Sequence, residues 1–263
     1  MNRMFPFVTH TCNPLGGGPC PFSCSYCWAT NLKNRYKYKK YQGPWRIYEK
    51  ELKTYKHGDF PFPFDMIDIG SPNIPDEIII TLMAWIAKQP CEMLLLTKNP
   101  AFYRENQDIM PHNAWLGATI ETDNNITLKF SKAPEPWRRL TEMQYVADNM
   151  PANKTFVSIE PIMGFSPDFE RELMKIRPHA VAVGYDNYNN QLPEPNLAAT
   201  EALIKELETF TTVYRKTIRE SRLSQQLRSS PDPGKPADEL EIAKSGITAS
   251  PSQVEAEKEK KEK

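Results

Sequence analysis

The chain has 263 residues, of which 40% are hydrophobic, so it is long enough to form one large α/β domain with a buried core. Its 33 Lys and Arg residues balance 33 Asp and Glu residues, and this zero net charge gives no overall attraction to nucleic acid or to an anionic membrane. No apolar run approaches the roughly 18 residues of a membrane span, and no secretory apolar segment follows the first residues.

Short apolar runs alternate with helix-compatible segments along most of the chain. Apolar runs of the length of a buried strand lie at residues 4–9, 66–70, 93–97, 115–120, 155–159 and 181–184, and residues 212–214 could add a short seventh strand. Helices are favoured at residues 78–88, 99–106, 137–149, 168–175 and 198–209. This alternation predicts parallel βαβ units, and six strands are too few for a closed eight-stranded barrel. We therefore predict an α/β fold, an open partial (β/α)6 barrel.

The last forty or so residues differ from the rest of the chain. Residues 224–263 contain no aromatic residue and end in a run of Glu and Lys, so little apolar burial is available to offset the entropy lost on ordering. We predict two parts: a barrel domain at residues 1–223 and a disordered low-complexity C-terminal tail at residues 224–263.

Five cysteines, most of them close together near the start, are typical of a metal site in a reducing compartment and not of a disulfide framework, so we expect a cytoplasmic protein. Cys20, Cys24 and Cys27 are spaced C-x3-C-x2-C just after the first predicted strand. Electron-carrier clusters are normally held by four cysteines, so a cluster held by three keeps one iron open for a ligand. Two alternatives use a fourth ligand: a structural zinc site completed by Cys12 or His10, or a closed iron–sulfur cluster completed by Cys12.

The triplet, with aromatic Tyr26 before its last cysteine, resembles the signature of the radical S-adenosylmethionine (SAM) enzymes. More narrowly, the chain is similar to an uncharacterised phage-protein-like branch, distantly similar to the spore photoproduct lyase group, through stretches at residues 13–14, 41–44, 49–52, 96–98, 158–161 and 214–216. The resemblance implies a radical-SAM-type barrel whose [4Fe-4S] cluster, on Cys20, Cys24 and Cys27, binds SAM at its open iron. It also implies a reductant such as flavodoxin or ferredoxin, and cleavage of SAM to a 5′-deoxyadenosyl radical that acts on an unknown substrate.

Polar residues at the ends of the predicted strands are the candidates for binding SAM. The resemblance implies that Gly70 and Ser71 stand where the family carries a glycine-rich motif for the methionyl amine. The usual Gly-Gly-Glu pattern is absent here, so Asp68, Asn73 or Asp76 would supply the polar groups. The full set of predicted SAM-binding residues is Tyr26, Asp68, Gly70, Ser71, Glu121, Ser158 and Glu160.

Three further polar residues at strand ends are candidates for contacting the substrate: Lys98, Asp186 and Lys216. Either lysine could instead pair with the SAM carboxylate, since an ammonium group is a compact point charge. The alternative to a binding role for the carboxylates at the strand ends is that each is an ordinary solvated side chain in a loop.

Basic and aromatic residues alternate through residues 33–46, a composition that can neutralise phosphates and stack on bases. The alternative, which we favour from the sequence, is an amphipathic helix with its tyrosines buried and its lysines solvated. Two functional classes therefore follow from the sequence: a radical SAM enzyme, or a non-enzymatic zinc or closed iron–sulfur module that binds nucleic acid.

Overall fold

The computed structural model describes residues 4–229. Its strands are β1 His10–Cys12, β2 Leu15–Gly16, β3 Arg46–Ile47, β4 Pro61–Pro63, β5 Met93–Thr97, β6 Ala114–Thr119, β7 Thr155–Ile159, β8 Ala180–Val183 and β9 Thr212–Arg215. Its α-helices are α1 Trp28–Tyr36, α2 Asp76–Ala87, α3 Ala101–Glu105, α4 Pro136–Asn149, α5 Phe169–Ile176, α6 Leu197–Leu207 and α7 Arg222–Ser229. Short 3-10 helices are η1 Lys39–Tyr41, η2 Glu49–Glu51, η3 Gln107–Ile109 and η4 Asn125–Lys129.

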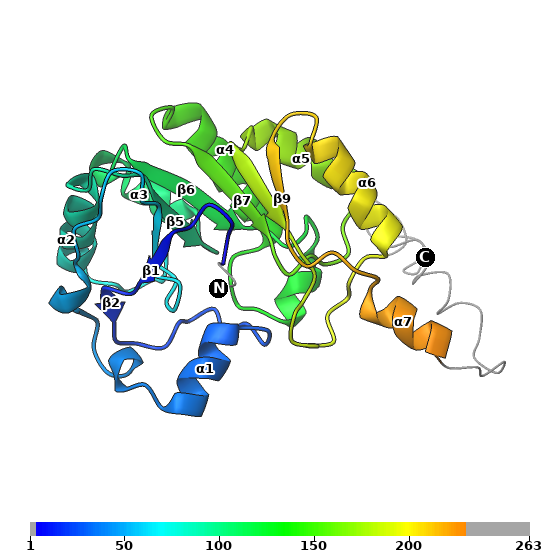
Figure 1. The fold of residues 1–263 in the computed structure, drawn as a ribbon, viewed down its shortest axis with the longest axis horizontal. Helices are drawn as coiled ribbons and strands as arrows, with labels where there is room; N and C mark the ends of the chain where they lie inside the picture. The colour runs from blue at the N-terminus through cyan, green and yellow to red at the C-terminus, as the bar shows by residue number, and fades with distance from the viewer. Residues whose placement is uncertain (1–3, 230–263) are drawn as a thin grey trace, which may run out of the picture.

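The main sheet is parallel throughout, in the strand order β5-β6-β7-β8-β9. β1 and β4 form a parallel pair, and β4 lies beside β5, so the curved sheet continues into this pair. Helices α2 to α6 cover its outer side (Figure 1). Among the described residues β1 pairs with β4 and β9 pairs with β8, so the barrel is not closed between β1 and β9. This is the predicted open, partial α/β barrel, and the expected fold class is confirmed.

Alternate residues of each strand face opposite sides of the curved sheet. Leu95, Leu116 and Val157 belong to the large core between the sheet and its helices. Leu94 and Trp115, which precede Leu95 and Leu116 along their strands, belong to a second cluster on the concave side, which also contains Phe156, Ala180 and Ala182. Side chains alternate between the two faces of a strand with a period of two. Polar residues that continue this concave series past the carboxyl ends of the strands are therefore expected to face that end of the barrel, which we call the mouth.

The N-terminal segment, predicted as the first strand at residues 4–9, does not form one; that prediction is wrong. Val8 N–H donates to the Phe5 carbonyl in a turn, and β1 begins only at His10. Phe5 packs edge-on against Phe156, and Phe7 packs against Tyr214 in β9. Its aromatic rings belong to the buried cluster on the concave side of the sheet. The backbone of the segment runs from the N-terminus up to β1 (Figure 1).

The second predicted strand, residues 66–70, is also wrong: β4 lies earlier, at Pro61–Pro63, and residues 65–70 turn. Phe64 has a positive φ of 69°, which ends the extended run after Pro63. The apolar side chains of Ile67 and Ile69 are buried in the large core despite the turn, so hydrophobicity was a correct sign of burial but not of conformation.

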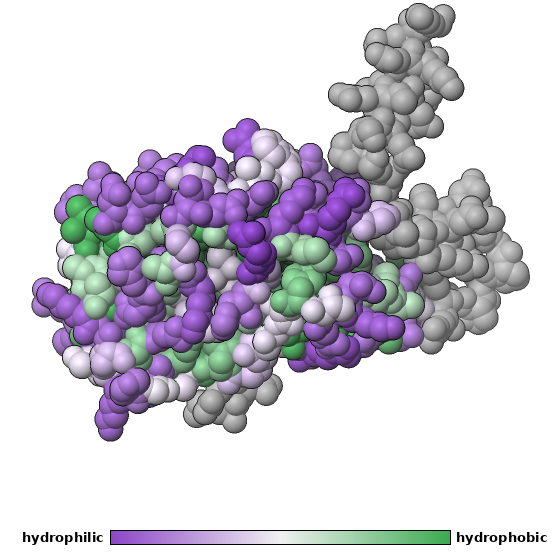
Figure 2. Space-filling model, turned by 90° about the horizontal axis from the view of Figure 1, so that it is seen from above, coloured by the Kyte–Doolittle hydropathy of each residue, from purple (hydrophilic) through white to green (hydrophobic). Residues whose placement is uncertain are grey.

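Helix α7 runs across the expected boundary between residues 223 and 224, while the remainder of the expected tail, residues 230–263, lies outside the described residues. Seen from above, hydrophilic residues cover most of the surface, with smaller apolar areas between them (Figure 2). Within residues 4–229, no helix is both long and apolar enough to cross a membrane.

Candidate functional site

The cysteine loop lies between β2 and α1 and is fixed to a segment that the sequence did not connect with it. Ser25 N–H donates to the Phe130 carbonyl, and Lys132 N–H donates to the Phe22 carbonyl, at 2.8 and 2.6 Å. The Cys24 thiol lies 3.1 Å from the Ser131 hydroxyl. The loop that follows β6 therefore clamps the cysteine loop from the side.

Cys20, Cys24 and Cys27 are all partly exposed thiols on this one loop. The Cys27 sulfur caps α1 by accepting from Thr30 N–H at 3.3 Å. Burial raises the pKa of Cys20 to about 11, and the nearby Asp68 carboxylate adds to that rise. Within residues 4–229 no three Cys, His, Asp or Glu side chains are gathered closely enough to hold a metal ion, so the three thiols do not converge in this conformation.

Tyr26, between the second and third cysteines, connects the loop to the ends of the strands. Its hydroxyl donates to Glu121 Oε1 at 2.6 Å, and its ring packs with Met163 and Leu192. Burial and the neighbouring Glu121 carboxylate raise its pKa well above the usual value. The cysteine loop is thus held over the carboxyl ends of β5 and β6.

Glu121 is fully buried and belongs to a cluster of charged groups, the Glu121 cluster, made of Tyr26, Lys98, Glu121 and Arg139. Arg139 Nη1 donates to Glu121 Oε2 at 2.5 Å, and Lys98 Nζ donates to Glu121 Oε1. Burial alone would raise the pKa of Glu121, but the two cations and their hydrogen bonds outweigh it and lower that pKa to about 2. Both carboxylate oxygens are therefore occupied, and Lys98 is committed to the same group.

Arg139 was missed by the sequence analysis although its side chain is fully buried. Its Nε donates to the Pro134 carbonyl and its Nη1 to the Thr119 carbonyl, while Nη2 finds no acceptor among the described residues. A signal was present: Arg139 stands on the buried face of α4, in series with Pro136, Leu140, Met143 and Val146. A charge on the apolar face of a helix predicts a buried ion pair.

Asp68, Gly70 and Ser71 form a tight turn against the end of β5. Asp68 Oδ1 accepts from Gly70 N–H and from the Thr97 hydroxyl at 2.9 and 2.5 Å, and Oδ2 accepts from Lys98 N–H at 2.8 Å. Burial raises the pKa of Asp68, and these hydrogen bonds offset part of that rise.

A Cβ at Gly70 would lie 2.3 Å from Thr97 Oγ1, so only glycine fits there. Ser71 Oγ turns back to the Asp68 carbonyl at 2.7 Å. The polar groups of this turn mostly bind one another.

Glu160 and Lys216 form a second charged group, the Glu160 pair, on the opposite side of the concavity. Lys216 Nζ lies 3.4 Å from Glu160 Oε1, and the Ser158 hydroxyl lies 3.5 Å from Oε2. The Glu160 side chain is 19% exposed, and burial raises its pKa despite Lys216 and Ser158. Lys216 also donates to the Met4 carbonyl and stands over the Phe5 ring. This carboxylate keeps acceptor capacity and faces the mouth.

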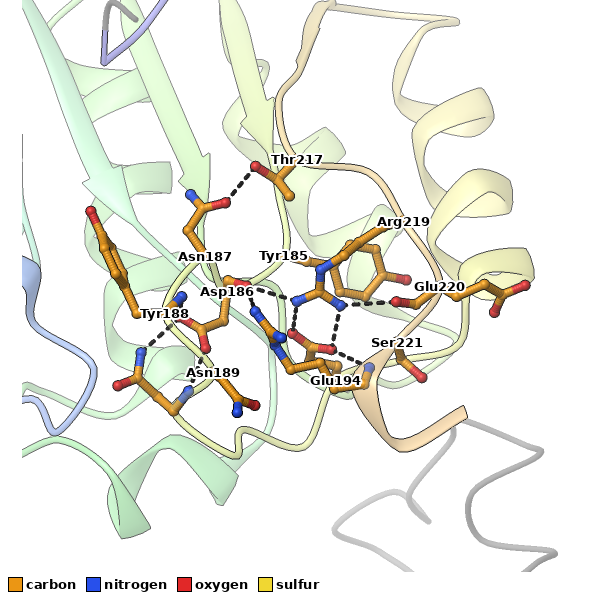
Figure 3. A network of polar contacts seen from close by, with 12 residues as sticks. Tyr185, Asp186, Asn187, Tyr188, Asn189, Glu194, Thr217, Arg219, Glu220 and Ser221 are labelled. Atoms are coloured by element: carbon orange, nitrogen blue, oxygen red, sulfur yellow. Dashed lines mark hydrogen bonds and ion pairs between the residues drawn. The ribbon is translucent and has the colours of Figure 1, made fainter. Parts of the chain in front are cut away.

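Asp186 shapes its own loop, as Figure 3 shows. Its carboxylate accepts from Tyr188 N–H at 3.0 Å and from Asn190 N–H at 2.6 Å. Arg219 makes two bonds to Glu194, at 2.6 and 2.9 Å, and a third to the Asp186 carbonyl. Asp186 is therefore placed as a loop anchor, and Arg219 and Glu194, which the sequence analysis missed, lock that loop.

Neither proposed fourth ligand lies with the cysteine triplet. Cys12 is buried in the large core between sheet and helices, where it contacts Tyr55, and burial raises its pKa to about 11. His10 begins β1 at the surface, 2.8 Å from the Thr9 hydroxyl and 3.8 Å from Asp59. An open pocket of about 460 Å³ beside the cysteine loop is lined by Phe22, Pro72, Asn99, Lys132 and Arg138, among others.

Solved structures with this fold include a cysteine-to-serine mutant of spore photoproduct lyase, with TM-score 0.56 and 11% identity over 82% of this chain and 80% of that chain. Spore photoproduct lyase complexed with dinucleoside spore photoproduct has TM-score 0.53 and 11% identity over 77% and 75%. SuiB of Streptococcus suis bound to S-adenosylmethionine has TM-score 0.50 and 10% identity over 81% of this chain and 48% of SuiB. These neighbours are radical SAM enzymes, and at such identities the likeness shows the shared fold.

Among curated proteins nothing matches the sequence. One family model, described as a protein of unknown function (DUF5131), matches residues 3–184.

Proposed function

The chain belongs to the family of unknown function DUF5131, and from its fold and site we propose that it is a radical SAM enzyme. One observation carries the proposal: the Tyr26–Glu121 hydrogen bond of 2.6 Å holds a three-cysteine loop over the carboxyl ends of the strands. In α/β barrels this end of the sheet carries the catalytic groups.

The donor set fits a [4Fe-4S] cluster with one open iron. Cys20, Cys24 and Cys27 supply three partly exposed thiols from one loop, the ligand type that such clusters use. In the present conformation Cys24 faces Ser131 and Cys27 caps α1, so these two side chains would turn toward a common point on binding. When bound, the cluster supplies the electron that cleaves SAM to methionine and a 5′-deoxyadenosyl radical, with flavodoxin or ferredoxin as the class of reductant.

The residues around the loop have distinct parts in this proposal. Tyr26, fixed by Glu121, offers one wall for the adenine of SAM. Glu160 is the carboxylate with free acceptor capacity, and it suits the ribose hydroxyls or the methionyl amine of SAM. Lys216 holds Glu160 from behind, while Glu121, Lys98 and Asp68 keep the surrounding loops in place.

The aromatic filling of the barrel limits how a reaction can proceed. Phe5 and Phe7 pack against Phe62, Phe156 and Trp115, so the concavity is closed below the polar layer. Under the proposal, substrate would reach the site from the mouth, and the aromatic packing of the described residues would keep water away from the lower side. A radical site needs such exclusion to avoid side reactions.

The test is anaerobic reconstitution of the full chain with iron and sulfide. We expect a brown protein that cleaves SAM to 5′-deoxyadenosine when reduced, and loss of bound iron when Cys20, Cys24 or Cys27 is changed to Ala. Cys12→Ala should retain cluster and cleavage; its loss of cluster would favour a closed four-cysteine site. A colourless protein that binds zinc in place of iron would overturn the proposal.

A further inference from the structure

The segment that follows the cysteine loop concentrates positive charge that the whole-chain balance conceals. No acidic residue occurs before Glu49. The basic residues between the loop and that point are Lys33, Arg35, Lys37, Lys39, Lys40 and Arg46.

These six are not equally available. Lys40 pairs with Glu51, Lys33 donates to the Met66 carbonyl, and Arg46 bonds backbone carbonyls such as that of Gln42. The other three, Arg35, Lys37 and Lys39, are exposed, and the structure records no ion pair for them within residues 4–229. A local cationic surface therefore exists on a neutral protein.

Two tyrosines stand exposed within this surface. Tyr36 is 55% and Tyr38 42% exposed, and their rings stack with centroids 5.7 Å apart and planes 25° from parallel. Helix α1 ends at Tyr36 because Lys37 takes a left-handed conformation, with φ 50°, which places Tyr38 beside Tyr36. The interpretation favoured from sequence, in which the tyrosines are buried, is wrong for these two, whereas Tyr41 does pack against the core.

The position of this surface relates it to the site. Cys27 caps the start of α1 and the tyrosines stand at its end, so the nine-residue helix separates them by only about 13 Å along its axis. The 186–192 loop lies on the same side of the molecule, since its Leu192 packs against Tyr26. That loop carries Tyr188, which is 64% exposed and stands clear of the Arg219 network in Figure 3.

We propose that residues 35–39 bind single-stranded nucleic acid, with phosphates on Arg35, Lys37 and Lys39 and bases stacked on Tyr36 and Tyr38. Cations that follow a backbone, with aromatic faces on which bases stack, are the two elements of such sites. An anionic membrane or an acidic protein would use the charges but would not need two stacked aromatic faces. The inference gives the proposed enzyme a substrate class and rests on that function for catalysis, whereas binding itself requires neither cluster nor SAM.

The first experiment measures stacking with the full chain, by fluorescence anisotropy of labelled single-stranded DNA, single-stranded RNA and duplex DNA of one length. The pair Tyr36→Ala and Tyr38→Ala should weaken single-strand binding roughly tenfold or more, because each stacked base contributes on this scale. The pair Tyr36→Phe and Tyr38→Phe keeps the ring faces and should keep the affinity. Equal affinities of the Ala and Phe pairs would overturn the proposal.

The second experiment measures charge through the salt dependence of the same binding. Changing Arg35, Lys37 and Lys39 to Ala should reduce the slope of log K against log salt by about 2, since each phosphate neutralised on a single strand contributes about 0.7. The control is the pair Lys88→Ala and Lys205→Ala, two exposed lysines, one at the C-cap of α2 and one on α6, which should leave the slope unchanged. If heparin binds as tightly as single-stranded DNA, and the Tyr36→Ala and Tyr38→Ala pair changes neither affinity, the surface binds polyanions in general. That result would contradict the inference.

The outcomes separate this inference from the proposed function. A chain that cleaves SAM but binds no single strand contradicts the inference alone. A chain that binds single strands through Tyr36 and Tyr38 but assembles no cluster contradicts the proposed function alone.

Discussion

The two charged groups that face the concavity use the same chemistry in opposite ways. In the Glu121 cluster a fully buried carboxylate is bound by two cations and a tyrosine hydroxyl, with contacts of 2.6 Å or less. In the Glu160 pair a partly exposed carboxylate has one cation at 3.4 Å and one hydroxyl at 3.5 Å. A carboxylate whose oxygens are all paired holds the structure together, whereas one with a free oxygen remains available for a ligand. The same substitution should therefore lower the stability much more at Glu121 than at Glu160.

The largest effect is expected from Glu121→Gln. This change leaves the Arg139 guanidinium and the Lys98 ammonium without their counter-charge in a buried site, at a cost of about 3 kcal/mol or more in the free energy of unfolding. Urea unfolding of the purified variant measures it. Glu160→Gln is the matched control and should cost less than about 1 kcal/mol. Equal losses for the two variants would remove the distinction between the groups.

The second prediction concerns acid. The folded-state pKa of Glu121 is lowered to about 2 from its usual 4.5, so its stabilisation is present above that usual value and is lost as the pH falls toward 2. The folded-state pKa of Glu160 is raised, so its contribution is present at low pH and is lost as the pH rises above its usual range. Unfolding curves from pH 2 to pH 7 measure both effects. The loss of unfolding free energy toward low pH should be smaller in Glu121→Gln than in the unsubstituted chain. The stability of Glu160→Gln, compared with the unsubstituted chain, should be more favourable at pH 7 than at pH 2.

The third prediction concerns the affinity for SAM and not the stability of the fold. Under the proposed function, Glu160→Gln should weaken SAM binding to the reconstituted protein by about tenfold, because a charge-assisted hydrogen bond is replaced by a neutral one. Equilibrium dialysis with SAM measures the affinity, and unchanged iron content is the control. Unaltered affinity would mean that SAM does not contact this carboxylate.

The last prediction concerns Gly184→Ala, for which a small loss of stability is expected. A Cβ there would lie 2.8 Å from Glu160 Oε1, the end of a flexible side chain, so the carboxylate shifts at a cost of about 1 kcal/mol. SAM affinity should fall by more than this stability loss suggests. Loss of stability with normal SAM affinity would show that the position of Glu160 does not matter for binding.

The pattern of predicted strands and of the polar residues that follow them was enough to predict several residues of this site. Lys98, Glu121, Glu160 and Lys216 were predicted as polar residues at the ends of strands, and in the structure they continue the concave-side series of their strands. The pattern could not show which carboxylate is saturated, because Arg139 reaches Glu121 from a helix that lies later in the chain.

Other features depend on contacts between distant segments, which periodicity does not encode. The Ser131–Cys24 contact joins residues 107 positions apart. Asp68 was predicted to end a strand, but its carboxylate instead bonds Gly70, Thr97 and Lys98, and a turn results. The exposure of Tyr36 and Tyr38 follows from one left-handed residue, Lys37, that no composition signal marks.

The aromatic filling of the barrel also constrains the order in which the chain can fold. Phe7 packs on Tyr214, and Lys216 reaches the Met4 carbonyl across 212 positions of sequence. These contacts cannot form until β9 has been made, so a growing chain cannot complete the burial of its first aromatic residues before the end of the barrel is synthesised. We expect the opening residues to dock late, as the step that completes the core.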